Sequence, residues 1–333
     1  MYKRQGTGYP YRLRNRTRLA GARVSFIDLD RKTRRVVNSG VAFDTVYDRH
    51  GRVVTLVGQT NETRTWQFGL SRLCSAQFVE AGRYGFVDNI FFTHEEISDP
   101  FDHPHGGSLW ALDVDSENLQ AAPAAGRMSW ENSTPLEISG DRIALLIGDD
   151  SKPQSQGAGT FGALATVHTL RKNIVGAPLW LFIGKKNAFP FEIRKTLPGY
   201  KLRGPSNFLN RNGLLVGDLY YFVAKNGLTT VGEFHDSGSV LSGKWVKIKV
   251  LDSAKAGKPG YDEWGYKDGF TLRREAKAGG AFQFSRPEDV STHPTVGTRA
   301  VFSSTGVDAI FPEDAWGTTV SYTHLTLPTI LLV

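Results

Sequence analysis

Residues 142–150, Arg-Ile-Ala-Leu-Leu-Ile-Gly-Asp-Asp, contain an apolar run that ends at a glycine and two aspartates. A run this short, bounded by glycine and aspartate, is typical of a β-strand that is buried on both faces. Similar runs recur at 22–29, 52–57, 90–93, 108–114, 179–184, 218–224, 245–250 and 299–304. Because these runs are rich in β-branched and aromatic residues and do not alternate with helical patterns, they predict an all-β fold.

Sandwich and propeller architectures both fit this pattern. A chain of 333 residues favours the β-propeller, because radial repetition enlarges a protein without one oversized core. The best helix candidates are residues 69–80 and 268–279. Residues 151–175 and 185–211 are too long for simple hairpins, so they are predicted to be loop insertions on one face of the domain.

Composition excludes several classes of protein. The chain is 40% apolar, which indicates a packed globule, and its one cysteine excludes an intrachain disulfide and a multi-cysteine zinc site. No apolar run is long enough to span a membrane as a helix. The formal charge is +7, but the basic stretch Arg12–Arg18 lacks interleaved stacking aromatics. We therefore expect a solvated basic surface and no nucleic-acid partner.

Both ends of the sequence resemble translated sequencing adapter. The two segments are residues 1–5, Met-Tyr-Lys-Arg-Gln, and residues 320–333, which begin Val-Ser-Tyr-Thr-His. On this interpretation residues 6–319 are a partial β-propeller domain from a longer protein, and a signal peptide would lie outside the sequence. Loss of Lys3 and Arg4 lowers the formal charge to +5.

The candidate functional residues are acidic groups that follow apolar strands. They are Glu95 and Glu96, Glu131, Asp149 and Asp150, and Glu288 and Asp289. Each one alone could equally cap a turn or face solvent. Carboxylates at successive strand ends can also converge on a propeller axis, where they would offer hard oxygen ligands for Ca²⁺ or Fe³⁺.

The order of these motifs resembles the PhoX-type alkaline phosphatase family. The motifs are Cys-Ser-Ala at 74–76, a strand into Glu-Glu at 95–96, Gly-Arg-x-x-x-Glu at 126–131, Gly-Asp-Asp at 148–150 and Arg-Pro-Glu-Asp at 286–289. The resemblance implies a six-bladed β-propeller, incomplete here, that is exported to the periplasm or the extracellular space. It also implies hydrolysis of a phosphomonoester substrate with a cluster of Ca²⁺ and Fe³⁺.

The resemblance also implies roles for individual residues. Arg286 would contact the substrate phosphate, and Cys74 would bind iron as a thiolate. The implied metal ligands are Cys74, Glu96 with Glu95 as its alternative, Glu131, Asp149 and Glu288.

A second hypothesis is a calcium-stabilised extracellular or surface β-propeller that binds a ligand without catalysis. It is favoured by residues 77–89, which replace the Gly-rich Thr-Pro-Trp-Gly-Thr-Trp stretch that the family has between its cysteine and its glutamate pair. A calcium-dependent lactonase-like propeller could share the carboxylates but does not predict Arg-Pro-Glu-Asp.

Histidines are concentrated in one region of the chain. His94, His103 and His105 lie near Asp99 and Asp102, between prolines and glycines. This spacing gives no recognised ligand geometry, so a polar surface loop is predicted in preference to a metal-binding loop.

Overall fold

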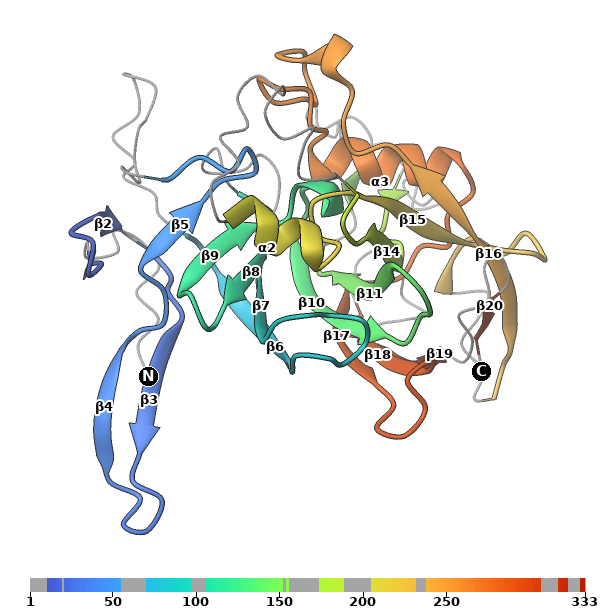
Figure 1. Cartoon of the computed structure of the whole chain (residues 1–333). Helices are drawn as coiled ribbons and strands as arrows, with labels where there is room; N and C mark the ends of the chain where they lie inside the picture. Colours follow the sequence, from blue (N-terminus) through green and yellow to red (C-terminus); the bar gives the residue numbers. More distant parts are fainter. Residues whose placement is uncertain are drawn as a thin grey trace, which may run out of the picture.

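The computed structural model describes most of the chain. The described residues are 11–19, 21–54, 70–96, 106–151, 154–155, 174–188, 205–231, 238–306, 317–322 and 330–332. Strands dominate them (Figure 1), and the predicted all-β fold is confirmed. No helix in these ranges is long and apolar enough to cross a membrane.

Two sheets and three two-stranded ribbons make up the β-structure. The five-stranded sheet has the order β5-β9-β8-β7-β6. Its strands are β5 (Thr45–Tyr47), β6 (Leu73–Val79), β7 (Ile90–Glu95), β8 (Leu109–Asp113) and β9 (Asn118–Ala121). The ribbons pair β1 (Tyr11–Arg12) with β2 (Arg18–Leu19), β3 (Ser25–Leu29) with β4 (Val36–Val41), and β12 (Gln154–Ser155) with β13 (Ile174–Val175).

The larger sheet has nine strands in the order β10-β11-β14-β15-β16-β20-β19-β18-β17. Its strands are β10 (Trp130–Leu136), β11 (Arg142–Asp149), β14 (Trp180–Lys185), β15 (Gly217–Ala224), β16 (Leu241–Ile248), β17 (Pro287–Thr292), β18 (Ala300–Ser304), β19 (Thr318–Tyr322) and β20 (Ile330–Leu332). Among the described residues the α-helices are α2 (Pro205–Arg211) and α3 (Gly269–Ala278), and the short 3₁₀-helices are η1 (Pro123–Ala125) and η4 (Ser253–Lys255).

The apolar run that opens at residue 142 forms β11, which is buried on both faces. Ile143, Leu145 and Ile147 pack into one hydrophobic cluster, while Ala144 and Leu146 pack into a second cluster on the other face. Because successive side chains of a strand point to opposite faces, a strand between two cores must be apolar at every position. The continuous run in the sequence is therefore explained by its central place in the sheet.

Three antiparallel meanders of at least four strands organise the described part of the chain: β6–β9, then β10-β11-β14-β15, which β16 continues, then β17–β20, whose last strand also pairs with β16. Their first strands, β6, β10 and β17, lie side by side near the middle of the molecule (Figure 1). Ser75 of β6 donates a hydrogen bond to the Glu131 carbonyl of β10, and Thr134 of β10 bonds Thr292 of β17 at 2.7 Å. Four-stranded meanders with their first strands gathered inward are typical of propeller blades. Six blades remain a prediction.

Two of the predicted elements have clear outcomes in the described residues. The predicted helix over 268–279 is confirmed as α3, which Asp268 caps by accepting a hydrogen bond from the Thr271 amide. The predicted helix over 69–80 is wrong, because residues 73–79 form β6 and pair with β7. Burial alternates along β6, so the period of its side chains is that of a strand.

Several other predictions fall wholly or partly outside the described residues. Most of the predicted insertions at 151–175 and 185–211 lie there, as do residues 1–5 and the end of the predicted strand over 52–57. Residues 52–54 form only an isolated bridge, between Val53 and Tyr47. Within the segment 320–333, residues 320–322 belong to β19 and 330–332 to β20. Adapter origin for this segment remains a prediction.

Candidate metal centre

The three meanders begin with the same local structure. Leu73, Trp130 and Pro287 stand at the start of β6, β10 and β17, and they pair with Glu95, Asp149 and Ser304 of the neighbouring strands. In each pair of strands the register shifts directly after that contact. A bulge of this kind bends the strand and changes the direction of the side chain within it. The residues next along the chain are Cys74, Glu131 and Glu288.

The second strand of each meander returns to the same place. The backbone amides of Glu96, Asp150 and Thr305 donate to the carbonyls of Arg72, Ser129 and Arg286, at 3.2, 3.0 and 3.1 Å. Each meander thus contributes one side chain from the start of its first strand and one from just beyond the end of its second strand. The repeat is structural, and Thr305 stands where the first two meanders have an acid.

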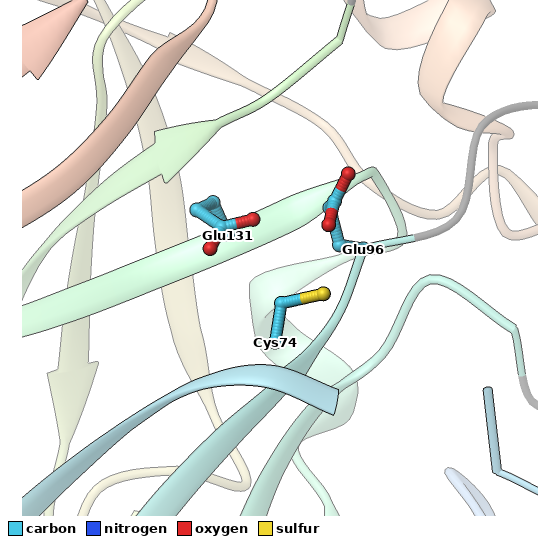
Figure 2. Close-up of side chains that lie close together, drawn as sticks. All are labelled: Cys74, Glu96 and Glu131. Atoms are coloured by element: carbon cyan, nitrogen blue, oxygen red, sulfur yellow. The ribbon is translucent and has the colours of Figure 1, made fainter. Parts of the chain in front are cut away.

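Cys74, Glu96 and Glu131 come closest to a metal-binding arrangement. Their sulfur and carboxylate oxygens all lie within 4.8 Å of one another. Figure 2 shows these three side chains directed toward one another from β6, from the residue after β7, and from β10. Glu96 is buried, Glu131 is half-buried and Cys74 is exposed, so the group opens to solvent on the cysteine side.

Asp150 and Glu288 extend this group on the side of Arg286. Arg286 binds Asp150 with two hydrogen bonds, from Nε at 2.7 Å and from Nη2 at 2.9 Å, and it binds Glu288 from Nη2 at 2.8 Å. The side chain of Glu96 also lies close enough to Asp150 to raise its pKa. We call Cys74, Glu96, Glu131, Asp150 and Glu288 the acidic cluster.

A glycine allows the two halves of the acidic cluster to meet. A Cβ atom on Gly148 would lie 2.4 Å from the carbonyl oxygen of Glu288, which is too close for any side chain. Because residue 148 has no side chain, the end of β11 can approach the start of β17. Asp150 consequently reaches both Arg286 and the neighbourhood of Glu288.

Crowding of acids perturbs the protonation of the cluster. Burial, together with the charges of Glu96, Asp150 and Glu288, raises the pKa of Glu131 to about 8. Burial also raises the pKa of Asp150 to about 7, against the opposing effect of Arg286. Burial, together with Glu96 and Glu131, raises the pKa of the Cys74 thiol to about 12. Without a bound cation the cluster therefore retains protons at neutral pH.

Two of the predicted metal ligands, Glu95 and Asp149, lie outside the acidic cluster. Both are fully buried. Glu95 accepts hydrogen bonds from the Ser71 amide at 2.8 Å and from the Trp110 indole at 3.3 Å. Asp149 accepts hydrogen bonds from Ser151 Oγ at 2.5 Å and from the Trp180 indole at 3.4 Å.

Asp149 also forms a buried ion pair with Arg273, whose Nη1 lies 3.7 Å from its carboxylate. In both acid pairs, then, the first acid bonds a tryptophan of the third strand and the second acid enters the cluster. We call Glu95, Asp149, Trp110 and Trp180 the supporting layer.

Sequence reasoning placed Cys74, Glu96, Glu131 and Glu288 in one site, and the structure brings these four together with Arg286. It named Asp150 among the acidic candidates but not among the metal ligands, and it did not select Arg72 or Thr305. A signal for Asp150 was present in the sequence: each acid pair precedes a Leu-Trp dipeptide, at 109–110 and at 179–180. Reading the two pairs as one repeat would have chosen the second acid in both.

His94 stands behind the acidic cluster in β7. It is fully buried between two serines, with Nδ1 3.3 Å from Ser75 Oγ and Nε2 2.9 Å from Ser133 Oγ. The prediction of a polar surface loop is therefore wrong for His94. The remainder of that histidine-rich stretch, residues 97–105, lies outside the described residues.

Comparisons with known proteins reveal a likeness in structure. No family model matches the sequence, and no curated protein matches it. The fold is similar to that of Pseudomonas fluorescens PhoX in complex with vanadate, a transition state analogue, with a TM-score of 0.53 and 14% sequence identity. The likeness covers 92% of this chain and 56% of that one, so the chain spans about half the length of the protein it resembles.

Proposed function

We propose that this chain is part of a PhoX-like, metal-dependent phosphomonoesterase that acts outside the cytoplasm. The observation that carries the proposal is the convergence of Cys74, Glu96 and Glu131, with donor atoms within 4.8 Å, from two successive meanders. The similar fold belongs to a protein that binds vanadate, an analogue of the phosphoryl transition state. In this chain Arg286, which can bind an anion, lies beside a group of carboxylates that can bind cations, and this arrangement suits phosphoryl chemistry.

The donor set fits the metals that the resemblance implies. Four carboxylates supply the hard oxygens that Ca²⁺ and Fe³⁺ prefer, and Cys74 adds a sulfur ligand suited to iron. Burial and the charges of neighbouring acids raise the pKa values of Glu131 and Asp150, and multivalent cations would neutralise those charges. Loading with metal is therefore expected to release protons from these side chains.

The residues of the chain have separate tasks in this proposal. Bound Ca²⁺ and Fe³⁺ would polarise the phosphoryl group and stabilise the charge on its oxygens. The acidic cluster holds the cations, and Arg286 lies at its edge with the side chain 24% exposed, as a phosphate contact must. Guanidinium groups match phosphate oxygens in geometry as well as in charge.

Hydrolysis of p-nitrophenyl phosphate by the full chain, supplied with Ca²⁺ and Fe³⁺, tests the proposal. We expect turnover that EDTA abolishes and that Glu288→Gln lowers by at least tenfold. Glu80→Gln, at an exposed position after β6, is the matched control and should leave the rate unchanged. Turnover that survives both EDTA and Glu288→Gln would refute the mechanism.

The second candidate is a calcium-stabilised binding protein without catalysis. The donor set favours it, because carboxylates outnumber the single thiol of Cys74 and carboxylates alone suit Ca²⁺. Residues 77–89, which stand in place of the Gly-rich stretch of the family, run from the end of β6 through the turn before β7. They lie at the opposite end of this hairpin from Cys74 and Glu96. Calcium-dependent melting without bound iron and without hydrolysis would support this candidate.

A further inference from the structure

Two arginines occupy equivalent positions around the acidic cluster. Arg72 directly precedes β6 and Arg286 directly precedes β17, and both carbonyls accept the amide of the corresponding residue in the second strand. Both residues also have positive φ, 45° for Arg72 and 66° for Arg286. Non-glycine residues adopt this conformation at a cost, and such residues concentrate at functional sites.

Most hydrogen-bond donors of the Arg286 guanidinium are already bonded to carboxylates of the protein. Its Nε and Nη2 atoms bind the two oxygens of Asp150, and Nη2 also binds Glu288. Thr305 Oγ1 donates to the same Glu288 oxygen at 2.8 Å. One full edge of the guanidinium is thus closed by carboxylates, and of its nitrogens Nη1 alone bonds no carboxylate among the described residues.

Arg72 is less committed and more exposed. Among the described residues its side chain bonds Glu96, through Nη2, and Cys74. The side chain is 48% exposed, compared with 24% for Arg286. Its two partners are also proposed metal ligands, so a cation bound there would compete for them and leave the guanidinium of Arg72 with donors to offer to an anion.

We propose that Arg72 is a second phosphate-binding residue of this site and that it contributes more to phosphate affinity than Arg286, which chiefly orients Asp150 and Glu288. The inference rests on the proposed function, since it concerns the same anion site. It adds a residue that the motif order did not indicate. It also places the phosphoryl group between Arg72 and Arg286, next to the neighbouring side chains of Glu96 and Asp150.

The test is binding of inorganic phosphate, measured by calorimetry on the full chain supplied with Ca²⁺ and Fe³⁺, with metal content determined for each variant. Arg72→Gln is expected to weaken binding by about 10- to 100-fold, as for the loss of a charge-assisted hydrogen bond, without loss of metal. Arg72→Lys should recover part of the affinity. Arg286→Gln should weaken binding at least fivefold less than Arg72→Gln does.

Arg31→Gln, at an exposed position in the turn between β3 and β4, matches the change in charge and should bind phosphate as the wild type does. If Arg72→Gln binds phosphate within twofold of the wild type, or if Arg286→Gln loses more, the inference is overturned while the proposed function stands. If the wild type itself neither binds phosphate nor hydrolyses p-nitrophenyl phosphate, both are overturned.

Discussion

The acidic cluster and the supporting layer contain neighbouring carboxylates with opposite environments. Glu95 and Asp149 are fully buried and bonded to tryptophans, whereas Glu96 and Asp150 face a group of acids and arginines. Moving by one residue along a strand turns the side chain to the opposite face of the sheet. Each acid pair therefore serves two purposes. Its first member is buried and holds the end of the strand in place through its bond to a tryptophan, and its second member is thereby directed into the acidic cluster.

The largest expected effect tests the structural half of this comparison. Asp149→Asn should destabilise the metal-free protein by about 3 kcal/mol, because it removes the charge opposite the buried guanidinium of Arg273. Arg273 is itself fully buried beside Asp149, so water cannot replace the lost charge. Asp150→Asn should cost less than about 1 kcal/mol, since Asp150 pairs with a partly exposed arginine.

Urea unfolding in EDTA, followed by tryptophan fluorescence, measures both variants. Equal losses for Asp149→Asn and Asp150→Asn would show that the supporting layer and the acidic cluster do not differ in their contribution to folding.

The next effect tests the cluster as a cation site. Calcium at about a hundredfold above its dissociation constant should stabilise the wild type by about 2.7 kcal/mol and raise its melting temperature by about 5 °C. Asp150→Asn should lose most of this shift. Asp141→Asn, at an exposed position just before β11, should keep it. Scanning fluorimetry with and without calcium provides the comparison, and an undiminished shift in Asp150→Asn would exclude Asp150 as a ligand.

A pH experiment examines His94, the histidine behind the cluster. Burial lowers its pKa to about 3, so the folded protein keeps the ring neutral while the unfolded chain binds a proton below about pH 6.5. Stability from this group is therefore complete above pH 6.5 and is lost as the pH falls. From His94 alone we expect a loss of about 1–2 kcal/mol between pH 6.5 and 5, whereas the raised pKa values of Glu131 and Asp150 make protonation favour the folded state over the same interval.

When urea midpoints are compared at the two pH values, His94→Gln should lack the His94 loss, so that its stability relative to the wild type rises by about 1–2 kcal/mol from pH 6.5 to 5. His293→Gln, at an exposed histidine, should leave the pH dependence as in the wild type. A pH dependence that His94→Gln does not change would assign the effect to other groups.

How much the sequence could predict depends on the range of the interactions. The strands at 90–93, 142–148 and 179–184 were predictable, because burial on both faces makes them continuously apolar. The helix predicted over 69–80 failed because pairing with β7, a long-range contact, decides the conformation of that segment.

The acidic cluster was predictable only in part, because long-range contacts also decide which side chains meet there. Cys74, Glu131 and Glu288 come together through bulges at the starts of three strands, and nothing in a single strand marks such a bulge. The choice between Asp149 and Asp150 depended on which of them meets Trp180, a residue of the next strand in the sheet. The register of β11 with β14 settles that choice, and the Leu-Trp dipeptide after each acid pair is its trace in the sequence.

The smallest expected effect concerns the third meander, in which Thr305 replaces the acid of the other two. Thr305→Asp would restore the acid, and it would place a second negative charge beside Glu288 in place of a hydroxyl donor. The metal-free protein should lose about 1 kcal/mol, as expected for like charges at a partly exposed site, and the calcium-induced melting shift should grow. Ser291→Asp, at an exposed position in β17, adds the same charge away from the site and should change neither quantity. If Thr305→Asp behaves like Ser291→Asp, then the third meander shares the backbone arrangement of the first two but not the function of their side chains.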